Sequence, residues 1–583
     1  MTKLTASPRL QPLTVETPDY GNRPHLVPTP LSLSRHTSVS SNDSSDGGNA
    51  TDTSSDINIK EETTGINSHS PEPQRPFPLT TPTRPYHIFP KVHKRVLVAI
   101  IGVAGLFSGL SSNVYFPALE AIAKDLNVSL ADVSLTITSY LVVQGISPLL
   151  WGSLSDTIGR RPIYIASFIV YIIANIGLSF SPNFVAVLLF RALQSAGSAS
   201  TVSIGNGVIQ DIAHPSEKGA YVSFYQAIRN FSIAVGPVLG GALSQRFGFR
   251  SIFVFLVIIS ALVFIFILVL LPETLRTIAG DGSIRLKGIY QPLLERLVKA
   301  PAGVRDQEDD SLRRKPVTLA SFLAPLRLLG QPDVLLHLVF GGLVYAAWSM
   351  VTSSTTGIFT RHFRLSELEL GLSFLPNGIG TIAGSSLVGC LMTRDFRAAE
   401  SAYNAAHGLP ATHKLPARAI PADFPLERTR LRHLPWITAL FVLSTAMYGV
   451  SLLRYAAADA DYRQQQLRWR IVFPLFTQFF VAATSNAVFA LNQSLVSDLC
   501  PGQGAGSTAT NNLVRCGLGA VGVAVVEMLV ERLGPVATFV GLALTVAVLA
   551  SPIAAVNWVY GPGWRAARIE KERASALGVA QSV

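Results

Sequence analysis

The sequence of 583 residues predicts an all-α polytopic membrane protein with twelve transmembrane helices in two six-helix halves. Three observations support this fold class. Hydrophobic residues make up 49% of the chain and charged residues only 14%, against about 25% in soluble proteins. Apolar runs of about 20 residues, the length that an α-helix needs to cross a bilayer, recur from Val96 onward. Two long polar stretches interrupt these runs, and one of them separates the sixth run from the seventh.

The composition also excludes several classes of protein. A soluble enzyme or nuclear regulator of this length would need more charge to cover its surface. The 30 phenylalanines exclude a chain that is disordered throughout. The net charge of +11 does not indicate nucleic-acid binding, because the basic residues share no patch with aromatic residues on a soluble module. Cys390, Cys500 and Cys516 give neither a disulfide framework nor paired metal-ligand spacing, so we expect no metal site.

The chain begins with a segment of different composition. Residues 1–90 are rich in Ser, Thr, Pro, Asn and Asp, and such a segment buries too little apolar surface to offset the entropy lost on ordering. We therefore predict a disordered cytosolic tail, for which regulation by phosphorylation and a passive role are both open. The first 30 residues contain no apolar core of a signal peptide, so the first span is expected to direct membrane insertion.

The remaining chain divides into two membrane regions joined by polar segments. We predict an N-terminal half over 91–271, a cytosolic central loop over 272–333 and a C-terminal half over 334–560 that contains a cytosolic loop over 393–433. Residues 561–583 are predicted to form a cytosolic C-terminal tail. The twelve predicted spans are 96–116, 134–151, 162–181, 184–208, 222–244, 251–271, 334–356, 368–392, 434–453, 471–493, 507–530 and 535–558.

The positions of the basic residues predict the orientation. With the N-terminus in the cytosol, the inward segments, including the cluster Arg313-Arg314-Lys315, carry more Lys and Arg than the outward segments. An even number of spans then places both termini in the cytosol, and much of the net +11 is a topology signal. We expect the plasma membrane, with a vacuolar or vesicle membrane as the alternative. Asn127, in Asn-Val-Ser of the first outward loop, is a candidate N-glycosylation site.

A glycine- and charge-containing loop lies between spans 2 and 3. It reads Gly152-Ser-Leu-Ser-Asp156-Thr-Ile-Gly159-Arg160-Arg161. Gly152 would permit close helix approach and Gly159 a tight turn. An Asp at a helix end can pair with nearby arginines and latch one conformation. The alternative is a helix-end turn whose charges only set the topology.

This loop resembles the signature motif of the major facilitator superfamily, G-x-x-x-D-x-x-G-R-[RK], and every anchor is present. The resemblance implies a transporter of two related six-helix halves. A degenerate second copy lies between spans 8 and 9, where Gly389-Cys-Leu-Met-Thr-Arg394-Asp395-Phe-Arg397 departs from the spacing. We therefore expect latch function of the first copy alone.

Span 4 contains a basic residue in the sequence Arg191-Ala-Leu-Gln194-Ser-Ala-Gly197. An arginine inside a membrane helix is costly unless it faces partners or water, so it indicates a functional site by default. The alternative is an arginine near a helix end that snorkels. The segment resembles the R-x-x-Q-x-x-G motif that the family's antiporters use in proton transfer. Because an arginine stays protonated, we expect Arg191 to bias a carboxylate, a substrate or a water chain rather than carry the proton itself.

Span 5 contains Gly236-Pro237-Val-Leu-Gly240-Gly241. Glycines at these spacings make a smooth helix face, and Pro237 removes a backbone hydrogen bond and bends the helix. The alternative is ordinary packing of small residues between membrane helices. The sequence resembles the family's antiporter motif, which is typical of proton-driven exporters and generally absent from uniporters and proton symporters.

Three further segments resemble the fungal twelve-span drug:proton antiporter family and its quinidine-resistance-like subgroup, over roughly residues 90–560: Ser112–Leu119, Gly207–Ile212 and Ala509–Cys516. The resemblance implies a proton-coupled exporter of a drug, toxin or fungal secondary metabolite. It would work by alternating access with the proton gradient as its energy source and no cofactor. Export of an organic acid or a polyamine, a facilitative or proton-symport nutrient importer, and a non-transporting membrane sensor are the alternatives. We expect no enzyme activity, since the sequence has no Walker A, H-E-x-x-H or G-x-S-x-G motif.

Polar residues inside the spans are the candidates for a substrate cavity near the midplane. For the amides and the tyrosine, hydrogen bonding between helices is the alternative. Span 1 has no Asp or Glu, so Asp211 and Glu527 are the candidate proton carriers. The alternative is that each is exposed to water near the end of a span. A cavity lined by Arg191, Arg229 and Arg515 would suit an anionic or neutral polar substrate better than a dication. The expected partners are a small molecule, protons and the lipid bilayer, and we expect a monomer. The candidate cavity residues are Asn113, Tyr115, Gln226, Arg229, Asn230, Asn486, Asn512 and Arg515.

Overall fold

The computed structural model describes residues 89–213, 215–282, 284–294, 305–306, 322–410, 415, 420–421, 423–453, 470–500 and 504–581. The predicted N-terminal tail, apart from its last two residues, and the basic cluster at 313–315 lie outside the described residues. The chain divides into two units, Met1–Thr81 and Pro82–Val583, and the helices described below belong to the second.

Long helices of 20 to 33 residues form the N-terminal half. A 3₁₀ turn, η1 (Phe116–Ala118), and the short helix α2 (Leu119–Leu126) connect the first two of them. The long helices are α1 (Lys91–Asn113), α3 (Leu130–Ser155), α4 (Arg160–Ser179), α5 (Phe184–Ile212), α6 (Pro215–Phe247) and α7 (Arg250–Leu270).

The C-terminal half repeats this pattern. Its first two long helices are connected by the short helix α12 (Glu367–Ser373), and α14 (Leu426–Leu431) precedes its third. The long helices are α11 (Pro332–Phe363), α13 (Leu375–Ala406), α15 (Leu434–Ser451), α18 (Val472–Leu499), α19 (Gly504–Thr545) and α20 (Ser551–Gln581), and a π-helical turn (Val546–Ala550) joins the last two.

The connection between the halves contains little regular structure in its described part. It includes α8 (Arg276–Ala279), the 3₁₀ turns Gly288–Tyr290 and Ala324–Gly330, and one parallel pair of two-residue strands. In that pair β1 (Ile284–Arg285) lies beside β2 (Arg305–Asp306).

The helices account for the twelve predicted spans. Ten continuous helical stretches in the described part of the chain are long and apolar enough to cross a membrane. One of them, Gly506–Lys571, contains two predicted spans that are divided at Gly534, where φ is 78°. Helix α6 adds the twelfth, although polar residues such as Arg229 and Asn230 interrupt its apolar sequence. The predicted all-α polytopic fold is therefore confirmed.

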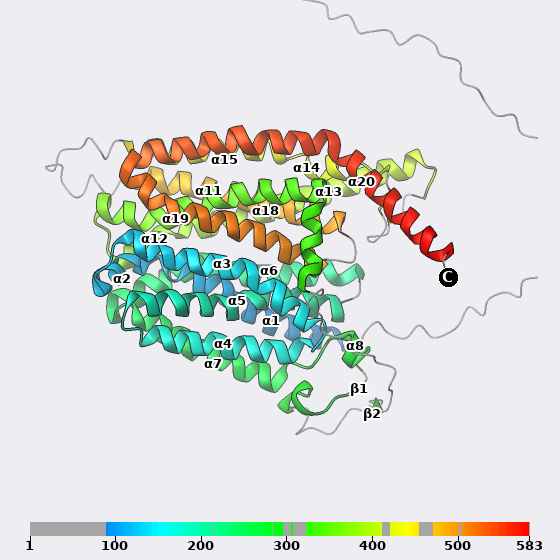
Figure 1. The fold of residues 1–583 in the computed structure, drawn as a ribbon, viewed down its shortest axis with the longest axis horizontal. Coiled ribbons are helices and arrows are strands. Elements are labelled where there is room, and N and C mark those ends of the chain that lie inside the picture. Colours follow the sequence, from blue (N-terminus) through cyan, green and yellow to red (C-terminus); the bar gives the residue numbers. More distant parts are fainter. Residues whose placement is uncertain are drawn as a thin grey trace, which may run out of the picture. The chain divides into compact units, whose positions relative to one another are not determined.

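The two halves lie side by side along the bundle (Figure 1). Helix α3 packs along α19, and α6 packs against α12 and α13. Helices α2 and α12 lie at one end of the bundle, which we call the α2/α12 end; α8 and the C-terminus lie at the other, which we call the α8 end (Figure 1). On the outside of the bundle, α7 exposes large apolar side chains such as Ile258 and Ile265, as expected of a helix that faces lipid.

Helical structure extends into two segments that were predicted to be a polar loop and a polar tail. Helix α13 extends to Ala406, although the sequence analysis placed a loop from residue 393, and α20 extends to Gln581 through the predicted C-terminal tail. Both extensions are rich in Ala, Glu and Arg, which favour helix without being apolar. Span prediction from hydropathy alone therefore ends these helices too early.

Buried ion pairs hold α20 against the C-terminal half. Arg565 lies 2.7 Å from Glu427 of α14, and both side chains are almost fully buried. The same guanidinium donates hydrogen bonds to the carbonyls of Phe424 and Pro421. Three residues further on, Arg568 pairs with Asp333 of α11 at 2.9 Å and donates to the carbonyl of Leu499 at the end of α18.

Replacing Arg565 with Ala should destabilise the folded protein strongly. The change leaves the carboxylate of Glu427 buried without its cation, which costs about 3–5 kcal/mol in comparable cases. The thermal denaturation of detergent-solubilised protein measures the effect as a lowered apparent midpoint. Arg428→Ala, which removes an exposed arginine of α14, is the matched control. Equal stability of the two variants would contradict this interpretation of the ion pair.

Candidate functional site

A cavity lies between the two halves of the bundle. Its walls come from α1, α3, α5 and α6 on one side and from α11, α18 and α19 on the other, and it is partly open to solvent. A concave site between helix bundles, lined by aromatic rings and a few polar groups, is a typical place for a small ligand to bind. Polar residues that line it include Ser108, Ser112, Asn113, Gln144, Arg229, Asn230, Ser349, Thr352, Asn486, Asn512 and Arg515.

Two arginines from opposite halves carry the charge of this cavity. Arg229 lies on α6 and Arg515 on α19, and each donates a hydrogen bond to a neighbouring amide, from Arg229 to Asn230 at 3.4 Å and from Arg515 to Asn512 at 2.8 Å. Neither guanidinium has a carboxylate within ion-pair distance among the described residues. The two charges repel each other. The cavity therefore presents positive charge that the described part of the protein does not neutralise.

Aromatic rings form one wall of the cavity beside Arg515. The guanidinium lies over the ring of Tyr345, 4.5 Å from its centroid, and 5.9 Å from that of Phe489. Trp348 completes this group, with its centroid 5.5 Å from that of Tyr345, and its indole N–H donates to Asn377 at 3.0 Å. The wall can therefore accept the apolar or planar part of a ligand whose charged groups reach the arginines.

The predicted cavity residues are largely brought together. Six of the eight line the cavity: Asn113, Arg229, Asn230, Asn486, Asn512 and Arg515. Tyr115 is fully buried outside it, and Gln226 is not among the lining residues, so these two predictions are corrected. Arg191 does not line it either, which leaves two of the three expected arginines. Periodicity along one helix could not find the aromatic wall, because apolar residues that face lipid and those that face a cavity look alike in the sequence.

Arg191 is held in a closed polar and aromatic pocket of the N-terminal half. Its guanidinium lies between the rings of Tyr115 and Tyr140, at 4.1 and 4.4 Å from their centroids. One nitrogen donates to the carbonyl of Ser111 at 3.0 Å and to the side chain of Gln194. The side chain is fully buried, so the alternative of a snorkelling arginine is excluded. Two of its nitrogens, Nε and Nη2, have no hydrogen-bond acceptor in the described part of the chain.

The other residues of the Arg191 motif position this pocket. Gln194 donates to Asn175 of α4 at 2.6 Å. At Gly197 a Cβ atom would lie 2.7 Å from the Ser167 carbonyl oxygen and from the Tyr171 nitrogen, so only glycine allows α5 to approach α4 this closely. A role of the motif in proton coupling stays a prediction.

The α2/α12 end of the bundle is closed by contacts between the halves. Thr356 of α11 donates a hydrogen bond to the carbonyl of Phe116 at 2.9 Å, and both residues are buried. The ring of Phe116 stacks on that of Phe374, with 5.7 Å between the centroids. Nearer the surface, the backbone N–H of Leu368 donates to Gln245 of α6 at 3.2 Å.

The glycines of the span-5 motif make this closure possible. A Cβ atom on Gly240 would collide with the backbone of Val114, and one on Gly241 would collide with the backbone of Glu367 in α12. Gly236 faces α1 at Asn113. Pro237 packs by its carbonyl against Gly371 of α12. Helix α6 therefore contacts α1 in its own half and α12 in the other half through backbone atoms, along the smooth helix face that the glycine spacing predicted. A role of this face in sealing the cavity during transport stays a prediction.

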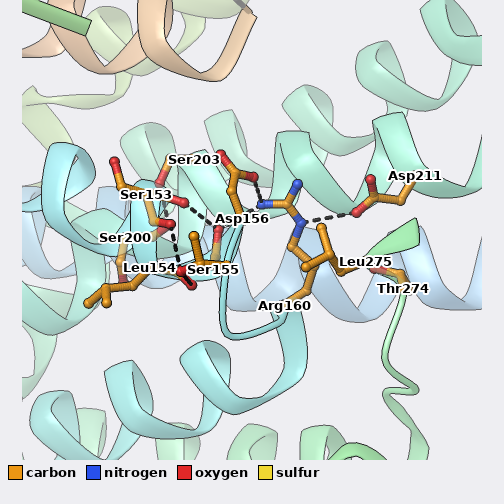
Figure 2. A network of polar contacts seen from close by, with 12 residues as sticks. Ser153, Leu154, Ser155, Asp156, Arg160, Ser200, Ser203, Asp211, Thr274 and Leu275 are labelled. Carbon is orange, nitrogen blue, oxygen red and sulfur yellow. Dashed lines mark hydrogen bonds and ion pairs between the residues drawn. The ribbon is translucent and has the colours of Figure 1, made fainter. Parts of the chain in front are cut away.

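At the α8 end, the loop between α3 and α4 forms a network of charged groups (Figure 2). Arg160 is buried and lies between two carboxylates, 2.6 Å from Asp156 at the end of α3 and 3.0 Å from Asp211 at the end of α5. It also donates to Ser155 at 2.7 Å. These partners all belong to the N-terminal half. The network braces three helices of that half in this conformation, and a latch between the halves stays a prediction.

The second arginine of the loop caps a helix. Arg161 donates five hydrogen bonds to backbone carbonyls, and those to Ile267, Leu268 and Leu271 hold it against the end of α7, where the Ile267 carbonyl also accepts from the backbone N–H of Leu271. Glu273 takes the complementary position, because its carboxylate accepts from the backbone N–H groups of Arg160 and Arg161 at the start of α4. Burial raises the pKa of Glu273, and backbone hydrogen bonds oppose this shift. Glu273 was not among the predicted site residues, although it closely follows the sixth predicted span in the sequence.

The two glycines of the loop have different roles. Gly159 adopts φ = 125°, and a Cβ atom there would approach the carboxylate of Glu273, so the expected tight turn is present. At Gly152 the nearest atom to a Cβ would be the hydroxyl of Ser203 at 3.9 Å, an ordinary contact. Close helix approach is therefore not the reason for Gly152 in this conformation, which corrects the expectation.

Two other segments from the sequence analysis are also located. In the degenerate second copy, Asp395 is buried and accepts from His433 at 2.6 Å, with Arg394 and Arg432 each 3.7 Å away. Asn127 is exposed in the turn between α2 and α3, and its glycosylation stays a prediction. The described residues contain no group of His, Cys, Asp and Glu that could hold a metal ion.

Gly159→Ala should lower the yield and thermal stability of the folded protein, and Gly152→Ala should not. The first change forces a side chain into a positive-φ position against a buried carboxylate, at a cost of about 1–3 kcal/mol. Size-exclusion profiles and thermal denaturation of the solubilised variants measure both effects. Two variants that behave alike would contradict the assigned difference between these glycines.

Comparisons with known proteins agree with this architecture. A solved POT family transporter, bound to 5-aminolevulinic acid, aligns with a TM-score of 0.52 over 81% of this chain and 96% of its own at 12% identity, which shows the fold alone. Citrate exporter 1 of Aspergillus niger is 43% identical over 511 residues, which are 88% of this chain and 94% of that protein. The MFS antiporter QDR2 of Candida albicans is 29% identical, over 78% of this chain and 86% of its own. The family model described as Major Facilitator Superfamily matches residues 101–523. The chain therefore belongs to the major facilitator superfamily of membrane transporters.

Proposed function

We propose that this transporter exports small organic acids with two or more carboxylates, in exchange for protons, by alternating access. The sequence motifs indicated a drug or secondary metabolite as the first candidate for the cargo, with an organic acid as an alternative. The cavity favours the organic acid. The observation that carries the proposal is the pair of arginines, Arg229 and Arg515, that face the cavity without a carboxylate partner among the described residues.

Electrostatics argues for an anionic cargo. A charge kept from water needs a counter-charge, and a charge-assisted hydrogen bond contributes about 1.5–3 kcal/mol. An acid with two carboxylates can neutralise both arginines at once and join the two halves, since one arginine belongs to each half. A polyamine would add positive charge beside Arg229 and Arg515, so the cavity argues against that alternative.

The conformation supports a cycle of alternating access. The α2/α12 end is closed through Phe116, Thr356 and Phe374. If the termini are cytosolic, as the basic residues predict, this is the outer end. The cavity would then receive its cargo from the cytosol, as export requires. The glycine face of α6 is the element that would separate from α12 when the outer end opens.

The relatives support the same proposal. Citrate exporter 1 of Aspergillus niger is more similar to this chain, at 43% identity, than the QDR antiporters of yeasts at 29%. The aromatic wall of Tyr345, Trp348 and Phe489 favours a second candidate, an aromatic drug or metabolite that carries an acidic group. The two candidates differ in the apolar part of the cargo and share the anionic part.

Inside-out membrane vesicles with an acidic interior should accumulate radiolabelled citrate. Protons leaving the vesicle would drive the anion in, so a protonophore should reduce accumulation to the level of vesicles without the transporter. Radiolabelled putrescine should not accumulate. Uptake that is unchanged after the gradient has collapsed would contradict proton antiport, and uptake of putrescine in preference to citrate would contradict the anionic cargo.

Arg229→Gln and Arg515→Gln should each raise the KM for citrate by roughly ten- to a hundredfold, the equivalent of one charge-assisted hydrogen bond. The effect on a monocarboxylate should be smaller, because one arginine suffices to bind it. Initial rates of uptake over a range of substrate concentrations in the same vesicles give the KM for citrate and the KM for the monocarboxylate. Arg246→Gln, which removes an exposed arginine of α6, is the matched control. A KM unaffected in both cavity variants would contradict the assigned site.

A further inference from the structure

The cavity itself offers no carboxylate among the described residues, so a proton that drives transport must bind elsewhere. The buried carboxylates of the described residues are Asp211, Glu273, Asp333, Asp395, Glu427 and Glu527. The first five are each satisfied by a cation, a histidine or backbone N–H groups. Glu527 of α19 is equally buried, at 3% exposed, but it differs from them because it forms no ion pair or hydrogen bond with a described residue.

Glu527 lies directly beyond the cavity, toward the closed α2/α12 end. Val523, one helical turn earlier on α19, lines the cavity. The rise of an α-helix puts Glu527 about 6 Å further along the axis. Across from it is Gly357 of α11, where a Cβ atom would lie 3.6 Å from both carboxylate oxygens. Gly357 adjoins Thr356, whose hydrogen bond to Phe116 closes this end.

Side chains become exposed to solvent one helical turn beyond Glu527. There Arg361 of α11 and Glu531 of α19 form a pair at 3.3 Å in which both side chains are about half exposed. Among the described residues, these are the two charged side chains with an electrostatic effect on Glu527: Arg361 favours its ionised form and Glu531 disfavours it. From the other half, Leu130 at the start of α3 approaches Gly357 and adds an apolar contact beside the carboxylate.

We propose that Glu527 is the proton-binding group of the exchange cycle, an assignment that rests on the proposed function above. A carboxylate that is 3% exposed beside Gly357 and Leu130 is costly to ionise, because no cation among the described residues is paired with it. It binds a proton from water on the outer side when the α2/α12 end is open, and a neutral carboxyl group permits that end to close. The proton then leaves to water in the inward-facing cavity.

The direction of exchange follows from this arrangement. The empty transporter returns to the inward-facing state with a proton on Glu527. Loss of that proton to the cytosol leaves an ionised carboxylate that disfavours the closed outer end, and the bound anion completes the switch to the outward-facing state. One proton entering on Glu527 is thereby linked to one step of cargo release on the outer side.

Glu527→Gln tests the proposal, because glutamine has nearly the same shape but cannot ionise. In inside-out vesicles the variant should lose gradient-driven accumulation of citrate. It should retain the exchange of internal unlabelled citrate for external labelled citrate, which needs no proton. Glu531→Gln removes an exposed carboxylate one turn away on the same helix, and it is expected to keep both activities. Its pair with Arg361 is solvated, so its loss should change stability little.

Each outcome has a defined meaning. Gradient-driven accumulation by Glu527→Gln, in a preparation where the wild type is also driven, would overturn the assignment of Glu527 and leave the proposed function in place. A wild type that exchanges citrate without any response to the gradient would overturn both. Loss of exchange together with driven uptake in Glu527→Gln would make the residue structural and would also overturn the assignment.

A second measurement does not depend on the yield of the Gln variant. Spin labels attached to cysteines at Lys124 of α2 and Leu368 of α12, in a chain with Cys390→Ser, report the separation of the halves at this end. In the wild type, the labels should be closer at about pH 5 than at about pH 8, since protonation favours closure. Glu527→Gln should show the closer distance at both pH values. A separation in the wild type that is independent of pH would overturn the proposal.

Discussion

A guanidinium group that is shielded from water must find a partner, and the arginines of this transporter are organised by that requirement. One group of arginines is satisfied within its own half, by carboxylates and by the free carbonyls at helix ends. A single arginine between two tyrosines is satisfied in part. The remaining pair faces the cavity and is left for a ligand. These three groups are Arg160, Arg161, Arg565 and Arg568; then Arg191; then Arg229 and Arg515.

The same grouping of arginines distinguishes the parts of the molecule that are braced from the part that can open. Each half has its arginine-centred network at the α8 end, where Arg160 braces one half and Arg565 the other. Between the halves, the α2/α12 end is held by one buried hydrogen bond, an aromatic stack and glycine-mediated backbone contact. These contacts can break without leaving an unpaired charge in an apolar environment. The structure therefore combines internally braced halves with a seam that can open, as alternating access requires.

Much of the fold was predictable because a membrane imposes it. Runs of about 20 apolar residues had to be helices, and the glycine motif of span 5 had to face another helix closely. The ends of α13 and α20 were not predictable from hydropathy, since these segments are polar and helix propensity rather than lipid contact favours helix there. Six cavity residues were predictable because polar side chains inside spans are costly unless they face a cavity or a partner on another helix. Tyr115 and Arg191 are buried within the N-terminal half and do not line the cavity, whereas Tyr345 does, and this difference depends on helix packing that spacing alone does not determine.

The central claim is that Arg229 and Arg515 together hold an anionic cargo between the halves. A cryo-electron microscopy structure of the full chain with citrate tests it most directly. The account predicts density in the cavity with one carboxylate within hydrogen-bond distance of Arg229 and another within hydrogen-bond distance of Arg515. Density for citrate outside this cavity, or a bound citrate that contacts neither guanidinium, would contradict it.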